Sequence, residues 1–251
     1  MATDLQRDAA HTSEAAFTDN RLLSTFPPEL RQTLRDQIEI IQLEAGDMVL
    51  QRGTGVTSSI FPFGPTMISM IVDLGAGRSV EVASIGKEGA VGGIVSCGHA
   101  PAFARAEAIV AGPAARVPMR AIEEAKSGSG HLRNLFCRYS DYLLAQIMQS
   151  VACNSFHPIE QRAARWLLTA QDRAGDRLVL TQEALAGLLG VQRTTINAVA
   201  RQLTGEGLIA TRRGTIGIEN RAGLEARACE CYDRVEHFFA EMVGTSGLGR
   251  P

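Results

Sequence analysis

The side chains of this sequence best suited to chemistry gather between residues 181 and 213. From Gln192 to Gly214 there are four arginines and one acid, which gives a local net charge of +3 in a chain whose total is −2. Guanidinium groups neutralise phosphates and release counterions, whereas amide and hydroxyl groups can read base edges in a major groove. The pattern therefore predicts an interface for double-stranded DNA, and its candidate residues are Thr181, Gln182, Gln192, Arg193, Thr194, Thr195, Asn197, Arg201, Arg212 and Arg213.

Two short helices and a hairpin are predicted to position these residues. Thr181 can cap the first helix, and Gly190 permits a sharp turn before a second helix over about residues 192–203. Two short strands, 208–211 and 215–218, then flank a turn that places two arginines at its tip. This order is typical of a winged helix-turn-helix. The alternative is that two leucine-rich helices and a hairpin simply form a small core.

The segment before this module alternates between apolar and polar residues, with glycines at its corners. After a short helical piece around residues 22–41, short strands at close spacing are typical of an antiparallel barrel or jelly roll. We therefore predict an α+β chain with an N-terminal antiparallel β jelly roll, a long dimerisation helix and a C-terminal winged helix-turn-helix. The predicted strands cover residues 48–50, 67–74, 79–85, 106–111 and 114–118.

A long helix is predicted from His131 to about Asn154, where apolar residues recur at spacings of three and four. A helix of about 24 residues spans roughly 36 Å, and an apolar stripe of that length needs a partner. We favour a homodimer, because helix-turn-helix proteins commonly pair two modules about 34 Å apart. The alternative is a helix that packs only on its own domain. The candidate dimer residues are Leu132, Phe136, Tyr139, Leu143, Ile147 and Val151.

Length and composition are ordinary for a globular chain of two domains, with 251 residues, 45% hydrophobic and 21% charged. No run of 18 apolar residues and no apolar signal core is present, so we expect a cytoplasmic protein without a membrane partner. A regular stripe after the hairpin predicts a C-terminal helix. The expected divisions are a flexible tail over 1–20, a β-roll sensor domain over 21–126, the dimerisation helix over 127–156, the DNA-binding domain over 157–222, and the C-terminal helix and tail over 223–251.

Cysteine and histidine patterns predict no cofactor and no metal. The five cysteines include no CxxC pair, and the five histidines show no HxH, HxxxH or HExxH spacing. Cys229 and Cys231 would point about 200° apart on a helix, so they could not share one ion. We expect Cys231 to be a packing residue and keep Cys229 as a candidate redox-sensitive thiol. No set of catalytic residues is present, so no enzyme is expected.

The order of these modules resembles the Crp/Fnr superfamily of bacterial transcription regulators. The resemblance lies in residues 20–23, 43–47, 85–92 and 164–168 and in the helix-turn-helix itself. It implies a cyclic-nucleotide-binding-like sensor domain and a homodimer that binds an inverted repeat near promoters, with RNA polymerase as a partner. The alternative is a small-molecule or redox sensor in which the β domain dominates and DNA binding is weak.

Two departures from the family pattern carry further expectations. Nucleotide-binding members hold the ribose and the cyclic phosphate with a glutamate and an arginine, and the matching positions here lack both side chains. We therefore expect no cAMP binding by the usual contacts. The recognition helix has Arg193, Thr194 and Ala198 where readers of a TGTGA-type half-site have Arg, Glu and Arg, which implies a different operator. The effector-pocket positions are Gly92, Gly93, Ile94, Ala102, Phe103 and Ala104.

Overall fold

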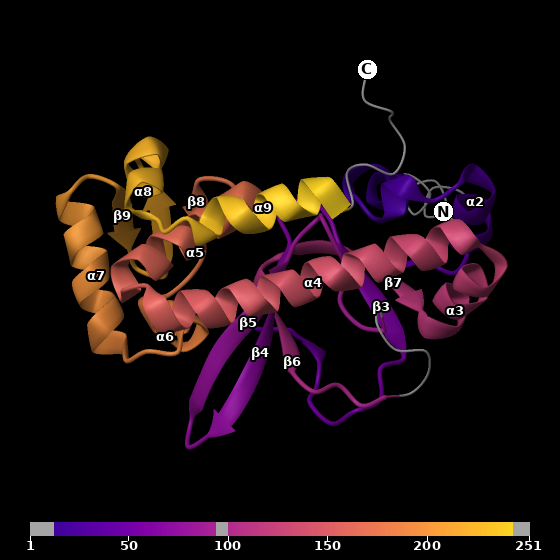
Figure 1. Cartoon of the computed structure of the whole chain (residues 1–251), viewed down its shortest axis with the longest axis horizontal. Helices are drawn as coiled ribbons and strands as arrows, with labels where there is room; N and C mark the ends of the chain where they lie inside the picture. Colours follow the sequence, from indigo (N-terminus) through magenta and orange to yellow (C-terminus); the bar gives the residue numbers. More distant parts are fainter. Residues whose placement is uncertain (1–12, 94–99, 243–251) are drawn as a thin grey trace, which may run out of the picture.

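The computed structural model describes residues 13–93 and 100–242 of the chain (Figure 1). Its N-terminal half contains two antiparallel sheets, of strand order β1-β7-β3 and β2-β6-β4-β5. A hydrophobic core of buried side chains joins them to the following helices. The elements are η1 (Leu23–Thr25), α2 (Pro28–Arg35), β1 (Glu39–Leu43), β2 (Met48–Leu50), β3 (Ser58–Pro62), β4 (Met67–Gly75), β5 (Arg78–Ile85), β6 (Arg105–Val110), β7 (Gly112–Pro118) and α3 (Met119–Gly128).

The five predicted strands are confirmed as β2, β4, β5, β6 and β7, and the mixed α+β class with them. Two strands were missed. The helical piece predicted around residues 22–41 is wrong at its end, because α2 ends at Arg35 and residues 39–43 form β1, which pairs with β7. The strand β3 shows no alternation, because four of its five residues are buried. Its partner β7 lies more than 50 residues away in sequence, as in the pair Ser58 and Pro118.

The expected flexible tail over 1–20 is wrong for residues 13–20. Residues 13–19 are helical, and Ala16 and Phe17 are fully buried in the core of the N-terminal domain. The buried amide of Asn20 donates to the carbonyl oxygens of Pro62 and Gly89, at 2.8 Å each. This segment is therefore part of the domain. The rest of the expected tail, 1–12, and the glycine-rich end of the chain, 243–251, lie outside the described residues.

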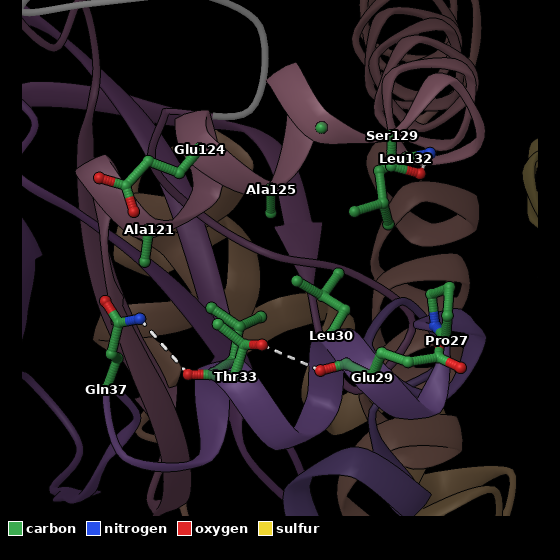
Figure 2. Close-up of a pocket in the computed structure, with 12 residues that line it drawn as sticks. Pro27, Glu29, Leu30, Thr33, Gln37, Ala121, Glu124, Ala125, Ser129 and Leu132 are labelled. Atoms are coloured by element: carbon green, nitrogen blue, oxygen red, sulfur yellow. Dashed lines mark hydrogen bonds between the residues drawn. The ribbon is translucent and has the colours of Figure 1, made fainter.

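A groove of about 420 Å³ separates α2 from α3 and the start of the next helix (Figure 2). Apolar side chains on both sides line it, among them Leu30, Ala125 and Leu132. At its floor Thr33 Oγ1 donates to the backbone oxygen of Glu29 at 3.0 Å. All of its lining residues belong to the N-terminal half, so the groove lies apart from the predicted DNA-binding module.

The long helix is confirmed as α4 (Gly130–Phe156), 27 residues or about 40 Å in length. The Ser129 side chain caps it by accepting from the Leu132 N–H at 3.3 Å. One side of α4 packs on the N-terminal domain, where the Tyr139 hydroxyl accepts from the Ala90 N–H at 2.9 Å and donates to its carbonyl at 3.0 Å. The helix is thus anchored to the sheet domain by both burial and hydrogen bonds.

The C-terminal half forms a second core centred on α5. Met67, Ile71 and Ile109 of the N-terminal sheet belong to the same core, and two polar contacts add to this packing. Trp166 Nε1 donates to Glu81 Oε1 at 3.0 Å, and Arg173 donates to Glu88 Oε1 through Nη2 at 2.6 Å. The elements of this half are α5 (Ile159–Ala174), β8 (Arg177–Leu178), α6 (Gln182–Leu189), α7 (Arg193–Gly205), β9 (Ile209–Arg212), β10 (Thr215–Ile218), α8 (Arg221–Arg227) and α9 (Cys231–Met242).

The single C-terminal helix predicted after the hairpin is in fact two helices. The helix α8 ends at Arg227, because Ala228 takes up an extended backbone conformation with ψ of 156°. The helix α9 then begins at Cys231 and runs back beside α4 (Figure 1), where the rings of Phe239 and Tyr142 lie 4.9 Å apart. Cys229 therefore precedes a helix and Cys231 starts it. The argument that these two thiols point in opposite directions on one helix does not apply.

Within the described residues, every helix is too short or too polar to cross a membrane.

Candidate nucleic-acid interface

The turn between α6 and α7 is built as the sequence predicts. Thr181 Oγ1 accepts from the Ala184 N–H at 3.0 Å and caps α6. Gly190 ends α6 in the left-handed conformation, with φ of +67°. A Cβ atom there would also come within 3.2 Å of the Val80 side chain on β5, so the turn rests against the N-terminal domain. Glycine is required at this position on both counts.

The helix α7 buries one side in the second core and leaves the other open. Ile196, Val199, Ala200 and Leu203 are buried, as the spacing predicted. The candidate residues lie on the opposite side. Four of them are exposed, namely Gln192, Arg193, Thr194 and Arg201, and two are half-buried, namely Thr195 and Asn197. In Figure 1, α7 lies at the outer end of the molecule, away from the sheets of the N-terminal domain.

The hairpin after α7 forms the predicted wing. Arg212 on β9 pairs with Thr215 on β10, so only Arg213 and Gly214 make the turn. Gly214 has φ of +73°, a conformation that glycine adopts without strain. Both arginines are exposed at the tip. A third short strand, β8, pairs with β10 and ties the wing to the end of α5.

Five of the candidate residues from three elements line one concave surface. This hollow, of about 350 Å³, lies between the start of α6, the start of α7 and the wing. The guanidinium of Arg193 stands 3.5 Å from Glu183 Oε2, and both side chains are largely exposed, so this ion pair is weak. An incoming anion or base edge can replace it. The five residues are Thr181, Gln182, Arg193, Arg212 and Arg213.

Residues 161–227 match the family of Crp-like helix-turn-helix domains. The chain is similar to FixK2 of Bradyrhizobium japonicum, with a TM-score of 0.65 and 16% identity over 76% of this chain and 98% of that one. It is also similar to a CRP-family transcriptional regulator of Thermus thermophilus, with a TM-score of 0.63 and 19% identity over 75% and 96%. No curated protein matches the sequence closely enough to count as a relative.

The same fold extends to the c-di-GMP responsive global regulator CLP of Xanthomonas campestris, with a TM-score of 0.61 and 14% identity over 76% of this chain and 99% of that one. Residues 161–227 are a Crp-like helix-turn-helix domain. This domain contains α6, α7 and the wing, so it is the module whose geometry is given above.

The predicted dimer stripe is wrong for most of its residues. Leu132, Phe136, Tyr139 and Leu143 are buried in the core of their own domain, Ile147 is half-buried, and only Val151 is exposed. The spacing correctly predicted an apolar face, but that face packs on the sheet domain. A second apolar strip lies on the outer side of α4, where Leu144, Met148 and Val151 are 50%, 61% and 62% exposed.

Within the described part of the chain, the expected effector-pocket positions do not line the cavity of the β domain. The cavity of about 470 Å³ in the β domain is lined by other residues, among them Ile41, Leu50, Thr57 and Arg116. Phe103 is 78% exposed and points away from the core, whereas Ala104 is buried and Ala102 half-buried. Gly92 contacts β3, since a Cβ atom there would come within 2.6 Å of the Ser58 oxygen. Ile94 lies outside the described residues.

Arg105, next to the expected pocket, binds carboxylates of its own domain. Its Nε donates to Asp73 Oδ2 at 3.1 Å, and its Nη1 donates to Glu107. To bind a cyclic phosphate, this guanidinium would have to leave or share the two acids that hold it.

Proposed function

We propose that this Crp/Fnr-type chain regulates transcription by binding an inverted-repeat site in double-stranded DNA as a homodimer, with RNA polymerase as a further partner. The observation that carries the proposal is the concave surface in which Arg193, Arg212 and Arg213 converge from a recognition helix and a wing. Its positive charge suits a phosphate backbone, and the exposed side of α7 fits a major groove. In this proposal, residues 21–126 form the sensor domain, residues 127–156 form the dimerisation helix, and residues 157–222 form the DNA-binding domain.

The second copy is proposed to dock on the outer strip of α4. Leu144, Met148 and Val151 lie four and three residues apart, so they share one helix face, and each is at least half exposed. The opposite side of α4 is already occupied by its own domain and by α9. Pairing α4 with its copy would bury the strip and set two recognition helices at a fixed spacing.

Met148→Glu is expected to convert the dimer to a monomer. A twofold axis along α4 would bring the two introduced carboxylates near each other in an apolar interface, and like charges so placed cost several kcal/mol. The dimer should therefore dissociate about 100-fold more readily or worse. Sedimentation velocity over a range of concentrations measures this. Arg120→Glu, at an 80% exposed side chain on α3, is the matched control and should leave the dimer intact. Equal dimerisation of both variants would show that the strip is not the interface.

The proposed function is tested by selection from random duplexes with the purified chain. A dimer of winged helix-turn-helix modules should enrich a palindrome of about 14–22 base pairs. The two halves should be related by the twofold axis, and their spacing should match one helical turn or a multiple of it. If no sequence is enriched, the DNA-binding proposal fails, and the sensor alternative takes its place.

We also propose that this chain does not bind cAMP by the usual contacts. The positions that would supply a ribose-binding acid and a phosphate-binding arginine hold glycine, alanine and phenylalanine, and Arg105 is paired with Asp73 and Glu107. Arg116, a cation that lines the neighbouring cavity, donates to Glu39 Oε2 at 2.9 Å. No catalytic role is assigned.

A further inference from the structure

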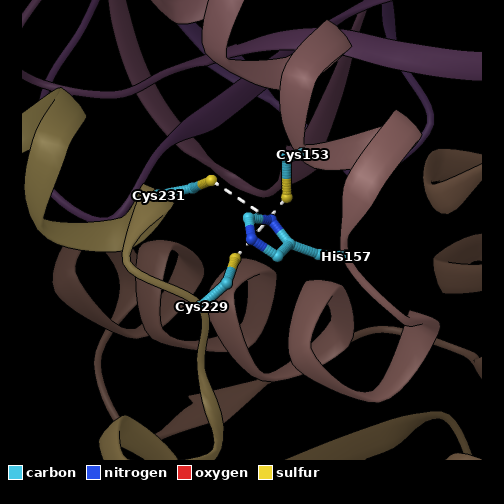
Figure 3. Close-up of side chains that lie close together, drawn as sticks. All are labelled: Cys153, His157, Cys229 and Cys231. Atoms are coloured by element: carbon cyan, nitrogen blue, oxygen red, sulfur yellow. Dashed lines mark hydrogen bonds between the residues drawn. The ribbon is translucent and has the colours of Figure 1, made fainter.

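Four potential metal ligands meet where the end of α4 touches the segment between α8 and α9 (Figure 3). Cys153 and His157 come from the last turn of α4 and its C-cap, and Cys229 and Cys231 come from the start of α9 and the residues before it. The three thiols are buried, with exposed fractions of 0%, 4% and 1% in sequence order. Their sulfurs and a nitrogen of His157 all lie within 4.8 Å of one another.

Two ligand–ligand distances in this cluster are close to the edges of a coordination tetrahedron. With Zn–S near 2.3 Å and Zn–N near 2.0 Å, a tetrahedral site separates two sulfurs by about 3.8 Å and a sulfur from a nitrogen by about 3.5 Å. The sulfurs of Cys153 and Cys229 lie 3.6 Å apart. The sulfur of Cys231 lies 3.4 Å from His157 Nδ1. One ion fits between them, whereas an iron–sulfur cluster would hold sulfurs on different irons farther apart.

The surroundings of the cluster are those of a metal site as well. His157 Nε2 lies 3.3 Å from Glu230 Oε2, so the nitrogen facing away from the cluster has a carboxylate acceptor. Histidines that bind metals through one nitrogen usually donate from the other to such a group. Gln149 Nε2 donates to the Cys231 sulfur at 2.9 Å, a contact that stabilises a thiolate.

The Arg165 guanidinium places a positive charge near the Cys153 thiol. Cys231 lies at the start of α9, where the helix dipole favours a negative sulfur. Zn²⁺ with three thiolates and a neutral imidazole carries one net negative charge, which the Arg165 guanidinium offsets.

We propose that Cys153, His157, Cys229 and Cys231 bind one Zn²⁺ ion in a tetrahedral S₃N site. All four positions are taken by protein side chains, so the site is structural rather than catalytic. The ion joins the end of α4 to the segment that follows the winged module. It thereby fixes α9 along α4 and holds the helix-turn-helix, through α8, at a set orientation to the proposed dimer helix. The binding site itself does not depend on the proposed DNA function.

Cobalt substitution tests the site directly. The reduced full-length chain, stripped with a chelator, is titrated with Co²⁺ without oxygen. It should bind one equivalent and develop thiolate-to-cobalt charge transfer with the strong visible bands of a four-coordinate ion, which Zn²⁺ then removes. Cys229→Ser should lose most of the charge-transfer absorption and affinity. Cys137→Ser is the matched control. Cys137 is an exposed thiol on α4, the helix that also carries Cys153, and this variant should bind Co²⁺ as the parent does.

A milder variant keeps the test independent of folding defects. Glu230→Gln leaves all four ligands in place and should weaken Co²⁺ binding about 10- to 100-fold. Zinc should also raise the melting temperature of the parent but not of Cys229→Ser, because an ion bound only by the native state stabilises it. The proposal is overturned if the reduced parent binds no cobalt, if Cys229→Ser binds it equally well, or if the bound cobalt shows the weak spectrum of an octahedral site. A reduced chain that ignores cobalt but forms a Cys153–Cys229 disulfide in air would assign these thiols to a redox pair instead.

Discussion

Arg173→Met is expected to destabilise the chain by about 3–5 kcal/mol, the usual cost of removing one partner from a buried ion pair. The Arg173 guanidinium donates to Glu88 Oε1 from Nε at 3.0 Å and from Nη2 at 2.6 Å, and the two side chains are only 5% and 10% exposed. The substitution would leave the Glu88 carboxylate desolvated between the two domains. Urea unfolding followed by fluorescence measures the loss, since the single tryptophan, Trp166, reports on the same domain contact.

Two further variants show whether the loss of stability comes from the unpaired Glu88 carboxylate. The double variant Glu88→Gln with Arg173→Met removes both charges and should recover a large part of the stability, because no buried ion is left alone. Arg120→Met breaks an exposed pair with Glu124 on α3 and should cost less than about 1 kcal/mol. If Arg173→Met unfolded at the same urea concentration as Arg120→Met, the buried pair would contribute nothing to holding the domains together.

Arg193→Ala is expected to weaken binding to the selected palindrome by about 1–3 kcal/mol for each half-site, which is about 5- to 150-fold for each half, and to relax the preference at one base pair of each half-site. Arg193 is the first residue of α7 and largely exposed, so its guanidinium can form two hydrogen bonds with guanine O6 and N7. Mobility-shift titrations with the selected duplex and a scrambled duplex measure the effect. The scrambled duplex should be bound almost as well as by the parent.

Arg212 in the wing is expected to contribute to DNA affinity without contributing to sequence preference. Arg212→Ala should weaken both duplexes to a similar extent and reduce the slope of log affinity against log salt by about 1, because a phosphate contact carries no sequence information. Arg120 lies on α3, outside the DNA-binding module, so Arg120→Ala should leave the affinities for both duplexes unchanged. If Arg193→Ala weakened the two duplexes equally, Arg193 would contact the backbone rather than a base.

Much of the DNA-binding module could be predicted because its signals are local. The Thr181 cap, the Gly190 turn and the apolar face of α7 each depend on residues within one or two helical turns of each other. The convergence of the wing on α6 and α7 could only be inferred. It requires the pairing of β10 with β8, which brings together residues far apart in sequence, such as Leu178 and Ile216.

The predicted dimer stripe on α4 shows what the spacing of apolar residues cannot predict. The helix α4 has apolar residues on two sides, and the more regular side, with Phe136 and Tyr139, packs in its own domain. Periodicity identifies a face that must be covered, but it does not identify the partner that covers it. The exposed strip with Leu144 and Met148 was distinguished only by the burial of its neighbours.

The cluster of three cysteines and His157 had a sequence signal that was missed. Cys153 and His157 are four residues apart, a spacing that places two side chains on one helix face. The two later cysteines were discounted because one continuous helix was assumed, whereas the chain breaks at Ala228. Even with the break known, the meeting of Cys153 with Cys229 across 76 residues follows only from the packing of α9 on α4.

By itself, the order of residues determined the elements of this protein: a sheet domain with glycine corners, a long helix, and a capped helix pair followed by a basic hairpin. Those features depend on backbone preference and short-range hydrogen bonds, which neighbouring residues supply. Three-dimensional packing alone decided which side of α4 is free, which acid holds Arg173 and which thiols meet at His157. Each of these depends on contacts between segments distant along the chain, and no local pattern encodes them.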